Sequence, residues 1–286
     1  MIFNWFIIVI AAVVGSMVGS FLNVCITRWP AEESILNPPR SRCPHCGRMI
    51  RWYENIPVLS WIALRARCAG CGEPISWLYP MVELATAVLW AGAFWLPQYL
   101  GLPGADSLFS SLRLAVFATI MLGVAVTDAR FYVIPDGFTL FGFFFILGAA
   151  TVGALRGDAT VFAGPWQGFL GACVGAGVIA IAGWLGEVAF RKEAMGFGDA
   201  TLMAVCGAAL GPQLALVNVF VAALLGAVAF LLFVGPFAWH RARRAGAEFE
   251  MPLVPFGVFL APASVVTLLW GERITAWYLD VLAAGS

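Results

Sequence analysis

The chain has 286 residues and no net formal charge; 62% of its residues are hydrophobic and only 11% are charged. Soluble domains carry about 25% charged residues, so this composition excludes an ordinary soluble protein and indicates a membrane protein. A net charge of zero points to no partner by itself, and we expect no nucleic acid among the partners.

Apolar runs long enough to cross a bilayer, about 20 residues each, recur through the chain. A shorter run at 200–210 becomes a thin span when it is counted from Gly196 to Gln213. We therefore predict an all-α polytopic membrane protein with about eight transmembrane helices, of which the sixth is the short one. The first run lacks a basic region before it, so we expect an uncleaved span and not a signal peptide. The longer runs are 3–27, 78–97, 109–127, 137–155, 166–190, 213–238 and 254–271.

The basic residues support this arrangement, because the cytosolic segments of membrane proteins are enriched in Lys and Arg. Without the short sixth span, the arginines at 241–244 would fall on the outer side and weaken that enrichment. The charges therefore favour eight spans, a periplasmic N-terminus and a cytosolic segment at 28–77. The basic residues that remain outside are Arg113, Arg156 and Arg273.

The polar segment 28–77 contains two C-x-x-C pairs, Cys43 with Cys46 and Cys68 with Cys71. Each pair can bind one edge of a metal ion, and two pairs close a tetrahedral thiolate site. We predict a small zinc-ribbon-like insert with a structural zinc ion, because a closed site leaves no position for catalysis. The alternatives are two disulfides, which a reducing cytosol disfavours, redox chemistry, or a degenerate site without metal.

The predicted domains follow from this polar insert. Residues 1–27 form the first transmembrane helix, residues 28–77 form the cytosolic four-cysteine domain, and residues 78–286 form a seven-helix membrane domain. A segment of this size with little apolar core benefits from a metal ion that holds it together.

Two aspartates lie at the ends of predicted spans. Asp128 ends the third span, and Asp199 begins the sixth, after the glycines Gly196 and Gly198. Both ends meet the cytosolic face, so we place the two carboxylates at similar depth. Two neighbouring carboxyl groups share one proton, and such a pair can activate water and protonate a leaving amine. This pattern predicts an aspartyl protease, with glycines that leave room for an extended substrate.

Helix capping is the alternative interpretation of the acidic residues. Asp199 is well placed as an N-cap, whereas a helix C-terminus disfavours an anion, so capping does not explain Asp128. For Asp136, which precedes the fourth span, we favour capping or support of the loop. Glu83 lies inside the second span, where it either pairs with a basic residue or supports the site.

Segments along nearly the whole chain match one known family. The Gly-Phe-Gly-Asp motif at 196–199 is weak evidence alone, but the segments together are specific. They are Gly19–Arg28, Ser41–Cys46, Arg51–Trp61, Cys68–Cys71, Pro74–Ser76, Tyr79–Glu83, Asp128, Ile134–Asp136 and 196–199. On these segments the chain resembles the bacterial type IV prepilin leader peptidases, also called prepilin peptidase/N-methyltransferases.

The resemblance implies a membrane aspartyl endopeptidase of the GxGD type, with Asp128 and Asp199 as its catalytic pair. Such enzymes remove the short basic leader from type IV prepilins and type II secretion pseudopilins, cutting after a glycine at the cytosolic face of the bacterial inner membrane. Many then methylate the new N-terminal amine with S-adenosylmethionine, an activity linked to the cysteine-bearing insert. No motif identifies residues that bind S-adenosylmethionine. The residues expected to support the catalytic pair are Gly196, Gly198, Asp136 and Glu83.

One position departs from the family pattern. Where the family commonly has a glycine between two basic residues before the second cysteine pair, this chain has Ala66 between Arg65 and Arg67. Alanine disfavours a positive φ. If that glycine serves a turn or the close approach of the cofactor, methyl transfer is weakened and cleavage is untouched. A peptidase without the second activity is therefore an alternative.

Two other functions remain as alternatives. A preflagellin-type peptidase would not methylate, but such proteins generally lack the cysteine insert. A non-enzymatic membrane assembly or transport protein would use the metal and the carboxylates for structure or for proton movement. Transporters often contain internal repeats, and this sequence shows no convincing one.

Overall fold

The computed structural model describes residues 5–191, 195–245 and 254–284, which are mainly helical. The chain forms two compact units. The first comprises Met1–Gly123 with Asp158–Thr160, and the second comprises Val124–Gly157 with Val161–Ser286. The long helix α4, Leu108–Phe131, begins in the first unit and ends in the second.

In the first unit, helix α1 (Trp5–Arg28) packs along helix α3 (Leu78–Leu100). A glycine permits the close contact, because a Cβ on Gly19 would lie only 2.7 Å from the Cα of Glu83. The side-chain amide of buried Asn23 donates a 3.0 Å hydrogen bond to the carbonyl of Tyr79. A buried amide needs such a partner, so this bond helps to set the register of the two helices.

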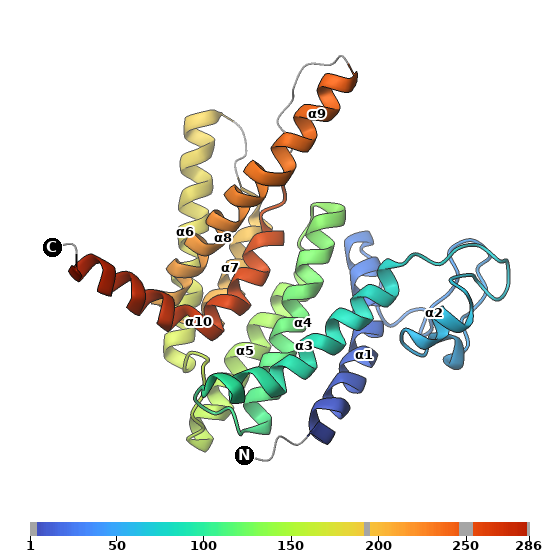
Figure 1. Cartoon of the computed structure of the whole chain (residues 1–286), viewed down its shortest axis with the longest axis horizontal. Helices are drawn as coiled ribbons and strands as arrows, with labels where there is room; N and C mark the ends of the chain where they lie inside the picture. The colour runs from blue at the N-terminus through green and yellow to red at the C-terminus, as the bar shows by residue number, and fades with distance from the viewer. Residues whose placement is uncertain (1–4, 192–194, 246–253, 285–286) are drawn as a thin grey trace. The chain divides into compact units, whose positions relative to one another are not determined.

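The polar insert between α1 and α3 contains little regular structure (Figure 1). It has two 3₁₀ turns, Trp29–Ala31 and Trp52–Asn55, and the five-residue helix α2, Leu59–Ala63. Contacts between side chains and backbone therefore hold it in shape. Arg48 forms an ion pair of 2.6 Å with Glu54.

The buried side chain of Arg28, at the end of α1, organises the first loop of the insert. Its guanidinium donates hydrogen bonds of 2.9–3.1 Å to three loop carbonyls. A guanidinium carries five donors in a rigid fork, so one side chain can satisfy several carbonyls at once. These carbonyls belong to Ser34, Ile35 and Pro38.

In the second unit, the short helix α7 (Phe197–Leu210) lies at the centre and contacts four other helices (Figure 1). Its residues from Leu202 onward are nearly all buried. The surrounding helices shield its polar backbone, which suits a helix that is short for a membrane span. These helices are α5 (Asp136–Arg156), α6 (Pro165–Phe190), α8 (Pro212–Ala229) and α10 (Gly257–Ala284).

Glycines on α6 let α7 approach closely. A Cβ on Gly171 would lie 2.1 Å from the carbonyl oxygen of Gly207, and one on Gly175 would lie 2.6 Å from that of Met203. Any side chain at these positions would overlap the α7 backbone. Small residues of this kind are typical of helix contacts in membranes, where close packing replaces the hydrophobic driving force.

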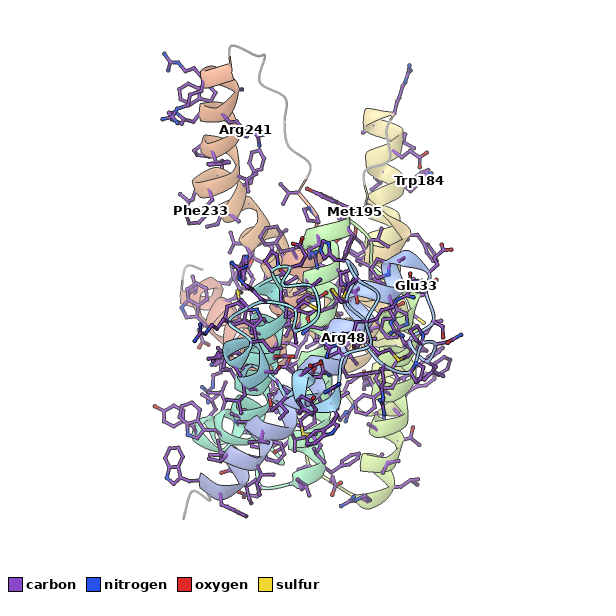
Figure 2. The ribbon with its side chains drawn as sticks, turned by 90° about the vertical axis from the view of Figure 1, so that its right-hand side faces the viewer. Glu33, Arg48, Trp184, Met195, Phe233 and Arg241 are labelled. Carbon is purple, nitrogen blue, oxygen red and sulfur yellow. The ribbon has the colours of Figure 1, made fainter. Side chains whose placement is uncertain are left out.

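Helix α8 continues through a π-helical turn, Phe230–Val234, into α9, Gly235–Ala245. Figure 2 shows Phe233 and Arg241 along this continuous helix. Phe233 is exposed, and α9 carries basic residues in its last turn. The helix therefore changes from apolar to basic along its length.

The predicted all-α class is confirmed. Seven helices in the described part of the chain are long and apolar enough to cross a membrane, and they coincide with the seven long apolar runs. The predicted short span is α7, an apolar helix of 14 residues. Helix α10 is longer than the predicted run 254–271, because residues 272–284 contain no helix-breaking glycine or proline. The predicted domain boundaries stay predictions.

Candidate active site and four-cysteine centre

The two aspartates singled out in the sequence come together in the second unit. Asp128 lies in the last turn of α4, and Asp199 lies in the first turn of α7. Asp128 is buried, Asp199 is partly buried, and the two carboxylates are close enough to interact electrostatically. The structure thus places both groups at one site, while their catalytic role stays a prediction.

The start of α10 forms a part of this site that sequence reasoning missed. The backbone N–H of Val258 donates a 3.2 Å hydrogen bond to Oδ2 of Asp128, and the N–H of Gly257 also interacts with this carboxylate. A helix N-terminus offers unsatisfied N–H groups and favours negative charge. It therefore offsets the unfavourable position of Asp128 at the end of α4. The Pro255-Phe-Gly257 sequence before an apolar run was the available signal.

Ile134 packs against glycines on both sides of the site. A Cβ on Gly198 would lie 3.0 Å from the Cβ of Ile134, and one on Gly257 would lie 3.1 Å from its Cδ1. The Cβ on Gly257 would also lie 2.7 Å from Oδ2 of Asp128. The glycines therefore allow α7 and α10 to close around the loop that follows α4.

The other predicted residues have distinct positions. Gly196 is the N-cap of α7, and the N–H of Asp199 donates a 3.1 Å hydrogen bond to its carbonyl. The interpretation of Asp199 as the N-cap is therefore wrong, because it lies three residues further on. Asp136 is exposed in the first turn of α5, after the N-cap residue Pro135. An acidic residue there suits the helix dipole, but Pro135 takes the N-cap position and no side chain caps the helix, so the predicted capping by Asp136 is wrong. Its support of the loop stays a prediction.

The local chemistry allows the two carboxyl groups to act on a peptide. Among the residues with described side chains, no basic group forms an ion pair with Asp128 or Asp199. The nearby guanidinium of Arg130 lies over the ring of Phe131, 5.0 Å from its centroid. Two carboxyl groups without a cation between them can share one proton, which gives one base and one acid in the same site.

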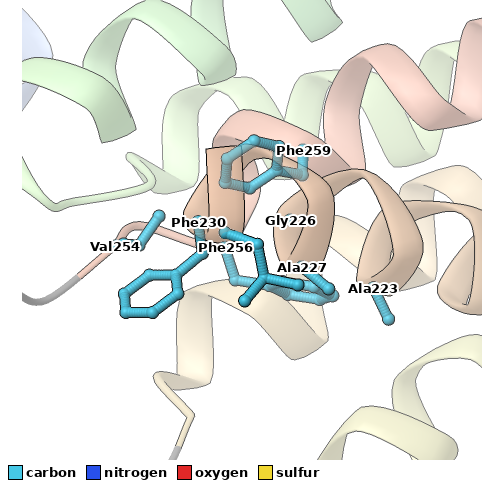
Figure 3. Close-up of a pocket in the computed structure, with 8 residues that line it drawn as sticks. Ala223, Gly226, Ala227, Phe230, Val254, Phe256 and Phe259 are labelled. Atoms are coloured by element: carbon cyan, nitrogen blue, oxygen red, sulfur yellow. The ribbon is translucent and has the colours of Figure 1, made fainter. Parts of the chain in front are cut away.

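An apolar pocket adjoins the start of α10 (Figure 3). Its volume is about 460 Å³, and both α8 and the segment that leads into α10 contribute to it. Phe256, in its wall, directly precedes Gly257 of the aspartate site. The pocket is lined by Ala223, Gly226, Ala227, Phe230, Leu231, Val254, Phe256 and Phe259.

The four predicted cysteines also come together, in the first unit. The sulfurs of Cys43, Cys46, Cys68 and Cys71 all lie within 4.8 Å of one another. The Sγ atoms of Cys43 and Cys71 are 3.9 Å apart. A tetrahedral zinc site with Zn–S bonds of about 2.3 Å separates its sulfurs by about 3.8 Å. The cysteines therefore have the donor set and the spacing for a metal ion, and all four are free thiols.

The two cysteine pairs have the same backbone conformation. In the first, the N–H of Cys43 donates to the carbonyl of Arg48, and the N–H of Gly47 donates to that of Cys43. In the second, Cys68 and Gly72 form the matching bonds. Gly47 and Gly72 have φ values of 70° and 75°, in the left-handed region that glycine adopts without strain. Each glycine lets the chain reverse direction directly after its cysteine pair.

Backbone donors favour the thiolate form at Cys68. The N–H groups of Cys71 and Gly70 interact with its sulfur and lower the pKa of the Cys68 thiol from 9.0 to about 6. The thiolate is the form that binds metal. Burial and the neighbouring sulfurs raise the pKa of the Cys71 thiol instead, so the structure favours the metal-binding thiolate at Cys68 and opposes it at Cys71.

Ala66 adopts a backbone conformation that favours glycine. Its φ is 58°, and its carbonyl accepts a 2.7 Å hydrogen bond from the N–H of Ile75. The departure at this position thus concerns a turn with positive φ, where an alanine is strained by its Cβ.

Glu83 belongs to the first unit, whereas the aspartate pair belongs to the second. Its Oε2 accepts a 2.7 Å hydrogen bond from the backbone N–H of Val58, in the polar insert. The predicted support of the aspartate pair by Glu83 stays a prediction. The observed contact instead connects Glu83 with the four-cysteine domain.

Comparisons with known proteins identify the family of the chain. The chain matches the model of the bacterial peptidase A24 N-terminal domain over residues 13–96 and that of the type IV leader peptidase family over residues 115–231. A prepilin leader peptidase/N-methyltransferase of Stutzerimonas stutzeri is 33% identical over 94% of this chain and 93% of its own length. No solved structure matches the chain.

Two further relatives carry the same name. The protein of Pseudomonas aeruginosa is 31% identical over 93% of this chain and 91% of its own length. That of Burkholderia pseudomallei is 36% identical over 94% of this chain and 86% of its own length. The class that these relatives define is that of the prepilin leader peptidase/N-methyltransferases. The chain belongs to the type IV leader peptidase family.

Proposed function

We propose that this chain is an aspartyl endopeptidase that removes the basic leader from type IV prepilins and type II secretion pseudopilins. The observation that carries the proposal is the meeting of Asp128 and Asp199, from the ends of α4 and α7, at one partly buried site. The chain also belongs to a family whose named members are prepilin leader peptidases.

Cleavage uses one water molecule and one shared proton. The ionised carboxyl of the pair takes a proton from water, and the oxygen of that water attacks the carbonyl carbon of the scissile bond. The protonated carboxyl donates its proton to the leaving nitrogen, so that the C–N bond breaks and an amine and a carboxylic acid form. The N–H groups of Gly257 and Val258 hold Asp128 in position during this exchange.

The chain also methylates the amine that cleavage releases. S-adenosylmethionine supplies a methyl group on a positively charged sulfur. The lone pair of the amine forms the new N–C bond as the C–S bond breaks, the bonding electrons pass to sulfur, and the nitrogen loses a proton to solvent. The relatives named above are N-methyltransferases as well as peptidases, which supports this second activity.

Zinc is the metal that best fits the four cysteines. Four thiolates at tetrahedral spacing form a closed structural site, so the ion would shape the insert and take no part in either reaction. The two matching turns around Cys43 and Cys68 support this assignment.

We place the protein in the bacterial inner membrane, with the N-terminus in the periplasm and the four-cysteine domain in the cytosol. The distribution of basic residues supports this orientation, and the seven long apolar helices support several crossings of the bilayer. Prepilin leaders are basic and remain on the cytosolic side, where the ends of α4 and α7 are expected.

One experiment tests the proposed function. The purified chain is reconstituted in membranes and incubated with a prepilin, once with S-adenosylmethionine and once without. The products of both reactions are analysed by mass spectrometry. We expect loss of the leader in both samples and an added methyl group only when the donor is present. A prepilin that stays intact would contradict the proposed peptidase activity. A cleaved but unmethylated product would contradict the methyltransferase activity and leave the chain as a peptidase only.

A further inference from the structure

A polar cavity of about 730 Å³ lies between the four-cysteine domain and the adjoining ends of α1 and α3. All of these elements belong to the first unit. The volume of the cavity is in the range of sites that bind cofactors and small ligands. The walls include Ser20 and Asn23 of α1, Glu83 of α3, and Trp61 of the insert.

A buried carboxylate faces this cavity. Glu83 is only 8% exposed, and its carboxylate has two donors, the backbone N–H of Val58 at 2.7 Å and the side chain of Ser20. Within the described part of the chain, no Lys or Arg forms an ion pair with it. An ionised carboxylate can accept about four hydrogen bonds, and a buried charge without a partner is costly. A cation from outside the chain would offset that cost.

Strained backbone holds the carboxylate in place. Val58, which donates to Glu83, has a φ of 61° and a ψ of −49°. A positive φ is a genuine outlier for a β-branched residue, and strain of this kind concentrates at functional sites. Arg28, which also lines the cavity, is buried and holds three carbonyls of the loop at 34–38. The cavity is therefore preformed by two separate polar anchors.

We propose that this cavity is the binding site for S-adenosylmethionine, with Glu83 as the anion that binds its sulfonium. The inference rests on the proposed methyl transfer and locates the donor site that no sequence motif identified. The donor carries two positive groups and a carboxylate. Glu83 provides negative charge in the interior, and Arg42 and His45 at the exposed rim provide complementary groups for the carboxylate.

Glu83→Gln is the decisive variant, because an amide oxygen still accepts the hydrogen bond from Val58 while the charge is lost. The matched control is Glu32→Gln, which changes an exposed glutamate of the same insert that is not among the residues lining the cavity. Binding of two ligands is measured by calorimetry on the purified full chain. S-adenosylmethionine has a charged sulfur, and S-adenosylhomocysteine has a neutral one.

We expect Glu83→Gln to weaken S-adenosylmethionine binding at least about tenfold and to affect S-adenosylhomocysteine much less, since a charge-assisted contact is lost only for the sulfonium. Glu32→Gln should bind both ligands like the unmodified chain. Unchanged binding of S-adenosylmethionine to Glu83→Gln, or equal weakening of both ligands, overturns the proposal.

A cleavage assay and a crosslinking experiment complete the test of the proposed S-adenosylmethionine site. Leader cleavage by the unmodified chain is measured on the same preparations, so that failure of the donor site is distinguished from failure of the peptidase. If the Glu83→Gln variant does not fold, ultraviolet crosslinking of radiolabelled S-adenosylmethionine to the unmodified chain replaces it. Label on peptides that contain Trp61 or Tyr79 supports the cavity, and label confined to other segments overturns it.

Discussion

The backbone N–H of Val258 lies 3.2 Å from Oδ2 of Asp128, although 130 residues separate them in the chain. This hydrogen bond joins the start of the last helix to the end of α4. It places a helix N-terminus, which favours negative charge, against an aspartate whose own helix disfavours it. The aspartate pair is thus built from three helix ends, and each of them can be altered separately.

The aspartates themselves provide the first prediction. Asp128→Asn and Asp199→Asn should each reduce prepilin cleavage by about 10²–10⁴-fold, because an amide can neither take the proton from water nor donate one as an acid. Cleavage is measured as the rate of leader loss in membranes. Asp106→Asn, at an exposed position between α3 and α4, is the control and should retain activity. Cleavage at the normal rate by either of the first two variants would falsify the catalytic pair.

Gly257→Ala should lower the rate of cleavage by about 10–100-fold, because the new Cβ would lie 2.7 Å from Oδ2 of Asp128 and displace a catalytic group. Gly148→Ala in α5 is the matched control, since nothing lies within 4 Å of a Cβ there. Both rates are compared with thermal unfolding of the purified variants. A Gly257→Ala enzyme as active as the control would show that the start of α10 does not position Asp128.

Removal of the metal should separate the two activities. Cys71→Ser leaves three thiolates, and we expect it to lose zinc and the order of the insert, since such small domains depend on metal for folding. Methylation should then fall to background while cleavage continues. Cys173→Ser in α6 lies outside the cluster and is the control. Elemental analysis should give about one zinc per chain for the control, and a metal-free unmodified protein would contradict the assignment.

Ala66→Gly should stabilise the four-cysteine domain by about 0.5–1 kcal/mol. Alanine is strained at a φ of 58°, and relief of that strain outweighs the greater freedom of glycine in the unfolded chain. Ala69→Gly, where φ is not positive, should give no such gain. The midpoint of thermal unfolding measures both variants. A lower midpoint for Ala66→Gly would mean that neighbouring contacts already compensate for the strain.

Much of this architecture could be predicted because its signals are local. Apolar runs of span length identified the seven long helices, and the spacing of Cys43, Cys46, Cys68 and Cys71 identified the cluster that the structure shows. Positive charge on one side supported the short helix α7, which hydropathy alone did not establish. At position 66 the structure has a positive φ, which fits a turn, one of the two roles considered for the family's glycine.

The remaining features depend on contacts between distant segments. The contribution of Gly257 and Val258 to Asp128 was missed, since only the fold brings the start of α10 to the end of α4. Glu83 was predicted to pair with a base or to support the site, and its contact with Val58 arises from docking of the insert on α3. An irregular insert gives no periodic pattern from which such a contact could be read.

The length of α7 affects how water reaches the reaction. Its 14 residues extend about 21 Å, whereas the hydrocarbon core of a bilayer is about 30 Å thick. The shortfall of about 9 Å is expected at the Asp199 end, because a carboxylate favours hydration and the opposite end turns directly into α8 at Gly211. A helix of full length would surround the scissile bond with lipid. With the short helix, we expect the water consumed by each cleavage to be replaced through the space beyond the Asp199 end.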